Sequence, residues 1–276
     1  MKTNNFTKFI FALFSAVLFL NGCFDLDSNL FNNTSLKSYN LSKAVIPESL
    51  RTQIVLSSQG KKIYGYYVQS PDPTQKLVVL YHHGNRDHLQ FYWDRVEYFY
   101  QMGFNVFIYD YQGYGMSEGE ASEAGIYSDA TAAYQFVRSK GFTDNRIINY
   151  GFSLGGAPAT YVASHVFTPK VHILESTFAS AEALVQSGTL ANFPGSFFMN
   201  GKYPTAENIT SVHCPVLIMH GEADTFIDME KNGKVIYRNA NNPKEFVPVP
   251  GANHSDVPQK MGIGKYFTLI KDFSLK

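Results

Sequence analysis

The chain has 276 residues, of which 45% are hydrophobic and 17% are charged, and its 23 basic residues balance its 23 acidic ones. This composition supplies enough apolar side chains for one large α/β core and carries too little charge for a disordered chain. Lysine and arginine form no run, so the positive surface that nucleic-acid binding requires is missing, and we exclude DNA and RNA as partners.

The first residues predict an export signal. Lys2 and Lys8 flank a polar start, and an apolar run over 9–20 leads into Leu20-Asn21-Gly22-Cys23. The run is shorter than the roughly 20 residues that cross a bilayer core, as in a secretory signal peptide. Its ending resembles the bacterial lipobox, in which diacylglycerol is attached to the cysteine. We predict a signal peptide over 1–22 and lipidation at Cys23, with ordinary cleavage and an uncleaved anchor as alternatives.

The segment after this cysteine predicts a tether. Residues 23–43 are rich in Asn, Ser, Asp and Lys with isolated apolar residues, which suits a linker between a lipid anchor and a domain over 44–276. We expect a lipoprotein of the cell envelope that faces the periplasm. Phe24, rather than an aspartate after the cysteine, favours the outer membrane under the enterobacterial sorting rule. Cys214, the second of two cysteines, is predicted to be a buried thiol.

From residue 52 onward, strand and helix patterns alternate. Apolar runs with strand character occupy 52–57, 62–68, 76–81, 105–109, 146–152, 171–175, 215–220 and 245–249. Apolar residues at helical spacing occupy 123–140, 154–167, 228–239 and 259–273. Near-continuous apolar strands that alternate with helices indicate a mostly parallel sheet of eight strands, covered by helices on both faces.

The longest departure from this alternation lies over residues 176–213. It contains Phe178, Phe193, Phe197, Phe198 and Tyr203 among other apolar residues, more than a connecting loop requires. We interpret this segment as a small lid.

A candidate nucleophile follows the fifth predicted strand. Gly151-Phe152-Ser153-Leu154-Gly155 fits the pattern G-x-S-x-G and is followed by Gly156. Between a strand and a helix, this pattern is typical of a serine on a tight, strained turn, where glycine gives the backbone room against the next helix. We therefore predict that Ser153 is the nucleophile.

A serine needs a base to take its proton and an acid to orient that base. In folds with this turn, the acid and the histidine follow the serine along the chain. Of eight histidines, His254 alone follows every candidate acid, and it lies between the last strand and the last helix. Asp224 closes the strand over 215–220, at the edge of the sheet where ligands bind. We predict Asp224 as the acid and keep Asp228 and Glu222 as alternatives.

Backbone amides are expected to stabilise the oxyanion of an acyl-transfer intermediate. One is the N–H of Leu154. The second is expected from the loop His82-His83-Gly84-Asn85 after the third strand, with Asn85 as donor. The alternative, a metal site formed by His82, His83, Asp87 and His88, matches no common zinc spacing. We predict no metal and no cofactor.

These motifs together resemble the α/β-hydrolase superfamily, in particular its small-lid branch of monoacylglycerol lipases, lysophospholipases and depalmitoylase-like thioesterases. The resemblance runs from Thr52 to the C-terminus. It includes the oxyanion segment His83-Gly84-Asn85, the loop Asp110 to Ser117, the serine turn, the H-G-x-x-D pattern ending at Asp224, and His254. Gln112 departs from it, since the branch often has arginine there.

The resemblance and the triad favour a serine esterase that hydrolyses ester or thioester bonds of small-molecule or lipid substrates with an apolar acyl group. A second enzyme hypothesis is an aminopeptidase, which requires a carboxylate for the substrate amine, with Glu175, Glu182 and Glu207 as candidates. The alternative from another class is a catalytically silent binding protein of the envelope.

Overall fold

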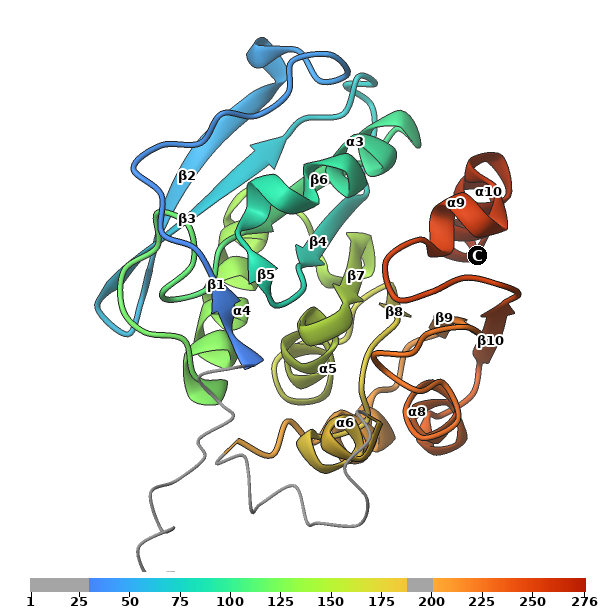
Figure 1. The fold of residues 1–276 in the computed structure, drawn as a ribbon. Coiled ribbons are helices and arrows are strands. Elements are labelled where there is room, and N and C mark those ends of the chain that lie inside the picture. The colour runs from blue at the N-terminus through green and yellow to red at the C-terminus, as the bar shows by residue number, and fades with distance from the viewer. Residues whose placement is uncertain (1–29, 188–200) are drawn as a thin grey trace, which may run out of the picture.

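A computed structural model describes residues 30–187 and 201–276. An eight-stranded sheet lies at its centre in the order β10-β9-β8-β7-β4-β6-β3-β2 (Figure 1). Within the described residues β3 alone runs against its neighbours, and the other pairs in this sheet are parallel. The strands are β2 (Arg51–Ser58), β3 (Lys61–Val68), β4 (Val78–His82), β6 (Asn105–Tyr109), β7 (Ile147–Phe152), β8 (Val171–Glu175), β9 (Val216–Gly221) and β10 (Lys244–Val249).

Helices cover both faces of the sheet (Figure 1), which confirms the predicted fold class. One face carries α3 (Trp93–Gln101), α9 (Val257–Met261) and α10 (Ile263–Leu275). The opposite face carries α4 (Glu123–Ser139), α5 (Gly156–His165) and α8 (Gly233–Asn239). Short 3₁₀ turns lie at Glu48–Leu50, Leu89–Tyr92, Asp144–Arg146, Ser153–Gly155 and Ile209–Ser211.

The core has two layers because strand side chains alternate between the faces. In β4, Val79 and Tyr81 pack with the cluster under α3 and α10, whereas Val78 and Leu80 pack with the cluster under α4 and α5. Each of these side chains is fully buried. Burial on both faces explains why the strands are continuously apolar in sequence rather than alternating.

Two of the predicted helices differ from the observed ones, and a proline in a third lies where a helix tolerates it. The helix expected over 259–273 is divided into α9 and α10 by Gly262, whose φ of +89° lies in the left-handed region. The helix expected from Asp228 begins at Gly233, because Asp228 instead accepts a hydrogen bond from the Lys231 N–H in a local turn. Pro158 is the third residue of α5, where a missing N–H costs no intrahelical hydrogen bond.

The structure differs from the expected tether over residues 30–43, which pack against the domain. Leu30, Phe31 and Leu41 are buried, and β1 (Asn32–Asn33) pairs in parallel with β5 (Arg86–Asp87). The isolated apolar residues of this segment are therefore anchors into the domain. The predicted signal peptide and Cys23 lie outside the described residues. Within residues 30–187 and 201–276, no helix is long and apolar enough to cross a membrane.

The described parts of the predicted lid contain two helices, α6 (Ala181–Ser187) and α7 (Thr205–Asn208). Phe178 and Tyr203 are buried and their rings pack edge to face, so part of this segment's apolar surface belongs to the core. Residues 188–200, with Phe193, Phe197 and Phe198, lie outside the described residues.

The approach of the loop after β4 to the serine turn generates a first prediction. A Cβ on Gly155 would overlap the carbonyl oxygen of His82 and lie 2.6 Å from that of His83. Because both are backbone atoms, they cannot move aside as a flexible side chain would. We expect Gly155→Ala to lower the free energy of unfolding by about 3 kcal/mol in urea denaturation. Gly264→Ala in α10, with no atom within 4 Å, is the control and should cost nothing.

Candidate active site

Ser153 lies in the turn that joins β7 to α5. Its φ of +53° is in the left-handed region, which a residue with a side chain adopts only at a cost in free energy. The surrounding glycines allow this sharp turn: a Cβ on Gly151 would lie 2.6 Å from the carbonyl oxygen of Gly155. The backbone conformation therefore matches the strained serine turn that the G-x-S-x-G pattern predicts.

The structure brings Ser153, His254 and Asp224 together. His254 Nε2 lies 2.9 Å from Ser153 Oγ, and His254 Nδ1 lies 2.8 Å from Asp224 Oδ2. A hydroxyl that donates to Nε2 and an Nδ1–H that donates to the carboxylate form the continuous chain that acyl transfer by serine requires. Of the alternative acids, Asp228 accepts from the Lys231 N–H and Glu222 is exposed, whereas Asp224 is the carboxylate that contacts His254.

Asp224 is held as an ionised carboxylate. Its Oδ1 accepts the N–H groups of Phe226 and Ile227 at 2.9 and 2.8 Å, and its Oδ2 also lies 3.4 Å from Nε2 of His220. Burial favours the neutral acid, but the hydrogen bonds from His220 and His254 outweigh it and hold the pKa of Asp224 well below its usual value. An ionised Asp224 fixes the tautomer of His254 and stabilises the imidazolium that forms when His254 takes a proton.

The loop that carries His254 is anchored by a buried ion pair. Arg95 Nη2 in α3 donates to Glu175 Oε1 at 2.6 Å and to the Ser255 carbonyl at 3.2 Å. Glu175 Oε2 accepts the hydroxyls of Tyr150 and Tyr266, each at 2.7 Å. Burial alone would lower the pKa of Arg95, but the Glu175 carboxylate keeps it above its usual value. Arg95 thus connects α3 and β8 to the residue next to the candidate base.

Sequence reasoning missed Arg95 because α3 contains no motif. The available signal was weak: an arginine among the apolar residues of a helical pattern, with Val96 and Phe99 beside it. Buried arginines are rare unless they are paired. The partner could not be identified, because Glu175 is 80 residues away in sequence.

The two predicted oxyanion donors lie at the same edge of the sheet. Leu154 follows the serine in the first turn before α5, where backbone N–H groups have no intrahelical acceptor. Asn85 follows β4, and its side-chain amide donates to the Leu30 carbonyl at 2.8 Å while its own carbonyl accepts the Tyr114 hydroxyl at 3.0 Å. In the described part of the chain its backbone N–H has no hydrogen-bond acceptor. This N–H is therefore available to a ligand.

The histidines of the alternative metal site have separate partners. His82 contacts the Tyr109 hydroxyl at 2.7 Å and Asn149 Oδ1 at 2.9 Å, and burial lowers the pKa of His82 to about 3. His83 Nε2 lies 3.2 Å from Asp110 Oδ1. Among the described residues, no three His, Cys, Asp or Glu side chains gather as metal ligands.

The loop after β6 shows what replaces the arginine at Gln112. The backbone N–H and the side-chain amide of Gln112 donate to the two oxygens of Asp129 at 2.8 and 3.0 Å. Burial raises the pKa of Asp129 because no cation faces it in this contact. In the same loop, Asp110 accepts the Leu89 N–H at 2.6 Å. The buried carboxylates of Asp110 and Asp129 thus tie this loop to the segments packed against it.

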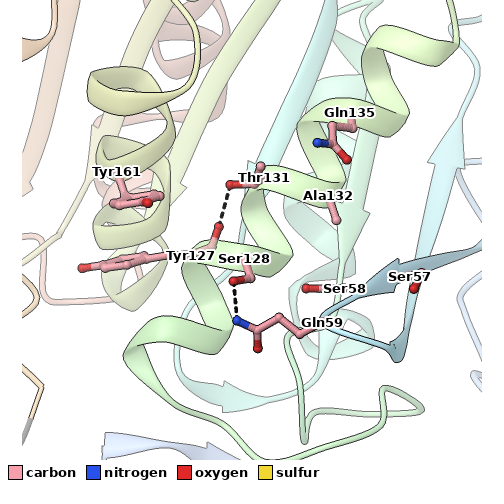
Figure 2. A pocket seen from close by; sticks show the side chains of 9 residues that line it. All are labelled: Ser57, Ser58, Gln59, Tyr127, Ser128, Thr131, Ala132, Gln135 and Tyr161. Atoms are coloured by element: carbon pink, nitrogen blue, oxygen red, sulfur yellow. Dashed lines mark hydrogen bonds between the residues drawn. The ribbon is translucent and has the colours of Figure 1, made fainter.

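A polar cavity of about 250 Å³ lies between the end of β2 and the helices α4 and α5, and its lining side chains are drawn in Figure 2. Gln59 donates to the Ser128 hydroxyl at 2.7 Å across it, and the rings of Tyr127 and Tyr161 stack at 4.3 Å. None of the predicted catalytic or oxyanion residues lines this cavity. We therefore place the candidate reaction at Ser153 and not here.

Comparisons with known proteins agree with the fold. Residues 73–179 match the family model described as serine aminopeptidase, S33. The α/β hydrolase domain-containing protein aho-3 of Caenorhabditis elegans is 35% identical over 68% of this chain and 55% of its own length. Human α/β hydrolase domain-containing protein 17B is 30% identical over 79% of this chain and 72% of its own length.

Among solved structures, the Pyrococcus furiosus esterase Pf2001 is similar in fold, with a TM-score of 0.73 and 18% identity over 88% of this chain and 96% of that one.

The low pKa of Asp224 predicts how stability depends on pH. Because this pKa is lower in the folded protein than in the unfolded chain, Asp224 contributes to stability at neutral pH. The contribution is lost as the pH falls below about 4, where the unfolded carboxylate takes up a proton. We expect the free energy of unfolding of Asp224→Asn, from urea denaturation, to fall less between pH 7 and pH 3 than that of the wild type. Asp228→Asn, the control, should keep the wild-type dependence, and equal slopes for Asp224→Asn would contradict this assignment.

Proposed function

Because the chain belongs to the α/β-hydrolase family, we propose that it is a serine hydrolase that cleaves carboxylic ester or thioester bonds of substrates with an apolar acyl group. The observation that carries this proposal is the position of His254, within hydrogen-bond distance of both Ser153 and Asp224. A base between a serine on a left-handed turn and an ionised acid is the arrangement that activates a hydroxyl as a nucleophile.

In the first half-reaction, Ser153 Oγ attacks the carbonyl carbon while its proton passes to His254 Nε2. The carbonyl oxygen gains the negative charge, and the N–H groups of Leu154 and Asn85 stabilise it. Collapse of this intermediate breaks the bond to the leaving group, which takes the proton from His254 and departs as an alcohol or a thiol. The acyl group remains as an ester on Ser153.

In the second half-reaction, water replaces the leaving group. His254 takes a proton from the water as its oxygen attacks the acyl-enzyme, and the same two amides stabilise the new oxyanion. Ser153 recovers its proton from His254 and the carboxylic acid is released. Asp224 stays ionised throughout, because its hydrogen bonds disfavour protonation.

Aromatic side chains around His254 support an apolar acyl group. Phe226 is 49% exposed and its ring meets the His254 ring at 5.1 Å, edge to face. Phe152 lies against His254 at 5.4 Å. Phe91, 47% exposed, follows the loop that carries Asn85. The exposed Phe226 ring beside the proposed base gives an acyl chain an apolar surface to pack against.

Among the described residues, no hydrogen bond or ion pair places Glu175, Glu182 or Glu207 beside His254 as a carboxylate for the substrate amine of an aminopeptidase. Glu175 is fully buried and is occupied by Arg95, Tyr150 and Tyr266. Glu182 and Glu207 are both exposed, and Glu182 also accepts from Gln186. A silent binding protein would not need the hydrogen-bonded Ser-His-Asp chain. The ester or thioester hypothesis therefore has the stronger support.

The location of the protein is a separate proposal that rests on the sequence alone. A lipid on Cys23 would hold the domain at a membrane of the cell envelope, which would bring Ser153 close to acylated lipids or proteins. This proposal adds no step to the chemistry above.

The role of Ser153 predicts a large loss of activity on substitution. Ser153→Ala is expected to lower kcat/KM for a nitrophenyl ester by about 10⁴-fold, because the nucleophile is removed. A fluorophosphonate probe should label the wild type and leave Ser153→Ala unlabelled. Ser164→Ala changes a serine of α5 that donates to the Thr160 carbonyl, and it should behave as the wild type. An unlabelled wild type would refute the proposal.

Because Glu175 is already bonded to other residues, we expect the protein to prefer acyl substrates over aminoacyl ones. The nitrophenyl esters of leucine and of 4-methylpentanoic acid differ only in the α-amino group and share one leaving group. We expect kcat/KM to be about 10-fold or more higher for 4-methylpentanoate, since the ammonium group would lose water without gaining a carboxylate. A higher kcat/KM for the leucine ester would instead favour the aminopeptidase.

A further inference from the structure

Residues 30–40, which we call the strap, cross the two loops that flank the candidate active site. One is the oxyanion loop, residues 83–88, which follows β4, and the other is the β6 loop, residues 110–117. Within the strap β1 pairs in parallel with β5, so that Asn32 lies opposite Arg86 and Asn33 opposite Asp87 (Figure 1). The strap thus adds a strand to the oxyanion loop itself.

The strap holds the oxyanion loop by side chains and backbone. The Leu30 carbonyl accepts the side-chain amide of Asn85 at 2.8 Å. Thr34 donates its N–H to the Asp87 carbonyl and its hydroxyl to Asp87 Oδ1, each at 3.0 Å. Asp87 has a φ of +54°, in the left-handed region that few residues with a side chain adopt. The bonds from Thr34 stabilise the loop in this strained form.

The strap is fixed from its other side by the β6 loop. The Gly115 N–H donates to the Thr34 carbonyl at 2.9 Å, and the Leu36 N–H donates to the Gly115 carbonyl at 2.7 Å. The hydroxyl of Tyr39 donates to Asp110. Tyr114 of the β6 loop contacts both other segments: its hydroxyl donates to the Asn85 carbonyl, and its ring packs against Phe31 of the strap at 6.4 Å.

Asn85 is therefore held at three points while its backbone N–H has no acceptor in the described part of the chain. The side-chain amide is tied to the strap, the carbonyl is tied to the β6 loop, and the next two residues pair with β1. Leu30 and Phe31 are buried, so the strap end beside Asn85 is itself anchored in the core. A preorganised donor of this kind costs no reorganisation when the oxyanion forms.

We infer that the strap is a positioning element of the active site. It holds the backbone N–H of Asn85 where it can donate a hydrogen bond to the oxyanion. The inference rests on the proposed serine hydrolase function. It assigns a catalytic consequence to a segment outside the sheet, whose sequence is that of a linker. Thr34 and the side chain of Asn85 are its positioning groups, and neither touches the reacting atoms through its side chain.

The test uses the full chain and separates turnover from binding. Asn85→Ala removes the side-chain anchor but keeps the backbone N–H, and we expect kcat to fall about 10- to 100-fold with KM unchanged, because the donor is misplaced. Thr34→Val removes one hydrogen bond and should lower kcat about 5-fold. Thr34→Ser keeps the hydroxyl and should restore the wild-type kcat.

A transition-state analogue supplies a readout that a structural role would not change. A trifluoromethyl ketone forms a tetrahedral adduct with Ser153 whose oxyanion occupies the proposed hole. Its inhibition constant should rise in the variants by the same factor as kcat/KM falls. The matched control is Asn241→Ala, which removes a side-chain amide bonded to the carbonyls of Thr210 and Val212 just before β10, at the opposite edge of the sheet. It should lower stability and leave kcat unchanged.

The outcomes are distinct. If Asn85→Ala and Thr34→Val lower only the free energy of unfolding, as Asn241→Ala does, and kcat stays within twofold, the strap is merely structural. The inference is then overturned, and the proposed function stands. If the wild type neither hydrolyses esters nor reacts with a fluorophosphonate, the proposed function fails and the inference falls with it.

Discussion

The left-handed turn at Ser153 is the constraint on which the other parts of the candidate site depend. It holds the serine between β7 and α5, and it requires glycine at positions where neighbouring backbone leaves no room for a Cβ. Because β4 is next to β7 in the sheet, the carbonyls of His82 and His83 pass directly against Gly155. The oxyanion loop therefore begins directly beside the turn that carries Ser153. Asp224 and His254 reach the same edge because parallel strands end there together.

Buried charge orients groups at this edge of the sheet. A buried ion pair such as Arg95 with Glu175 contributes little net stability, since desolvation offsets much of the attraction. Its geometry is specific, however, because both tyrosine hydroxyls donate to Glu175 and the Ser255 carbonyl accepts from Arg95. Asp224 follows the same rule with four donors around one carboxylate. In each case, polar groups that would be costly if unpaired fix the loop that carries a functional residue.

The sequence predicted the features that depend on local patterns of residues. β6 and β8 have the expected bounds, since a buried parallel strand is a short apolar run between turn residues. Ser153, Asp224 and His254 were predicted as a triad from one motif and from their order, and the structure brings their side chains together. Features formed by partners distant in sequence were missed. Arg95 gives no local sign of Glu175, and the strap resembles a linker because its bonds are to loops 50 to 80 residues away.

The two loops that serve Ser153 are anchored from different parts of the molecule. The strap and the β6 loop hold the side that carries Asn85, whereas α3 holds the side that carries His254, through Arg95 and the Ser255 carbonyl. Arg95 also reaches the serine turn, since its guanidinium lies over the Phe152 ring at 5.0 Å. Thr177, after β8, donates its hydroxyl to the Ser153 carbonyl at 2.7 Å. The proposed oxyanion donor and the proposed base are thus held by different segments, beside a serine turn that has contacts of its own. In such an arrangement a segment at the margin of the fold would act on the chemistry, because the loop that it pairs with carries the amide proposed to stabilise the oxyanion.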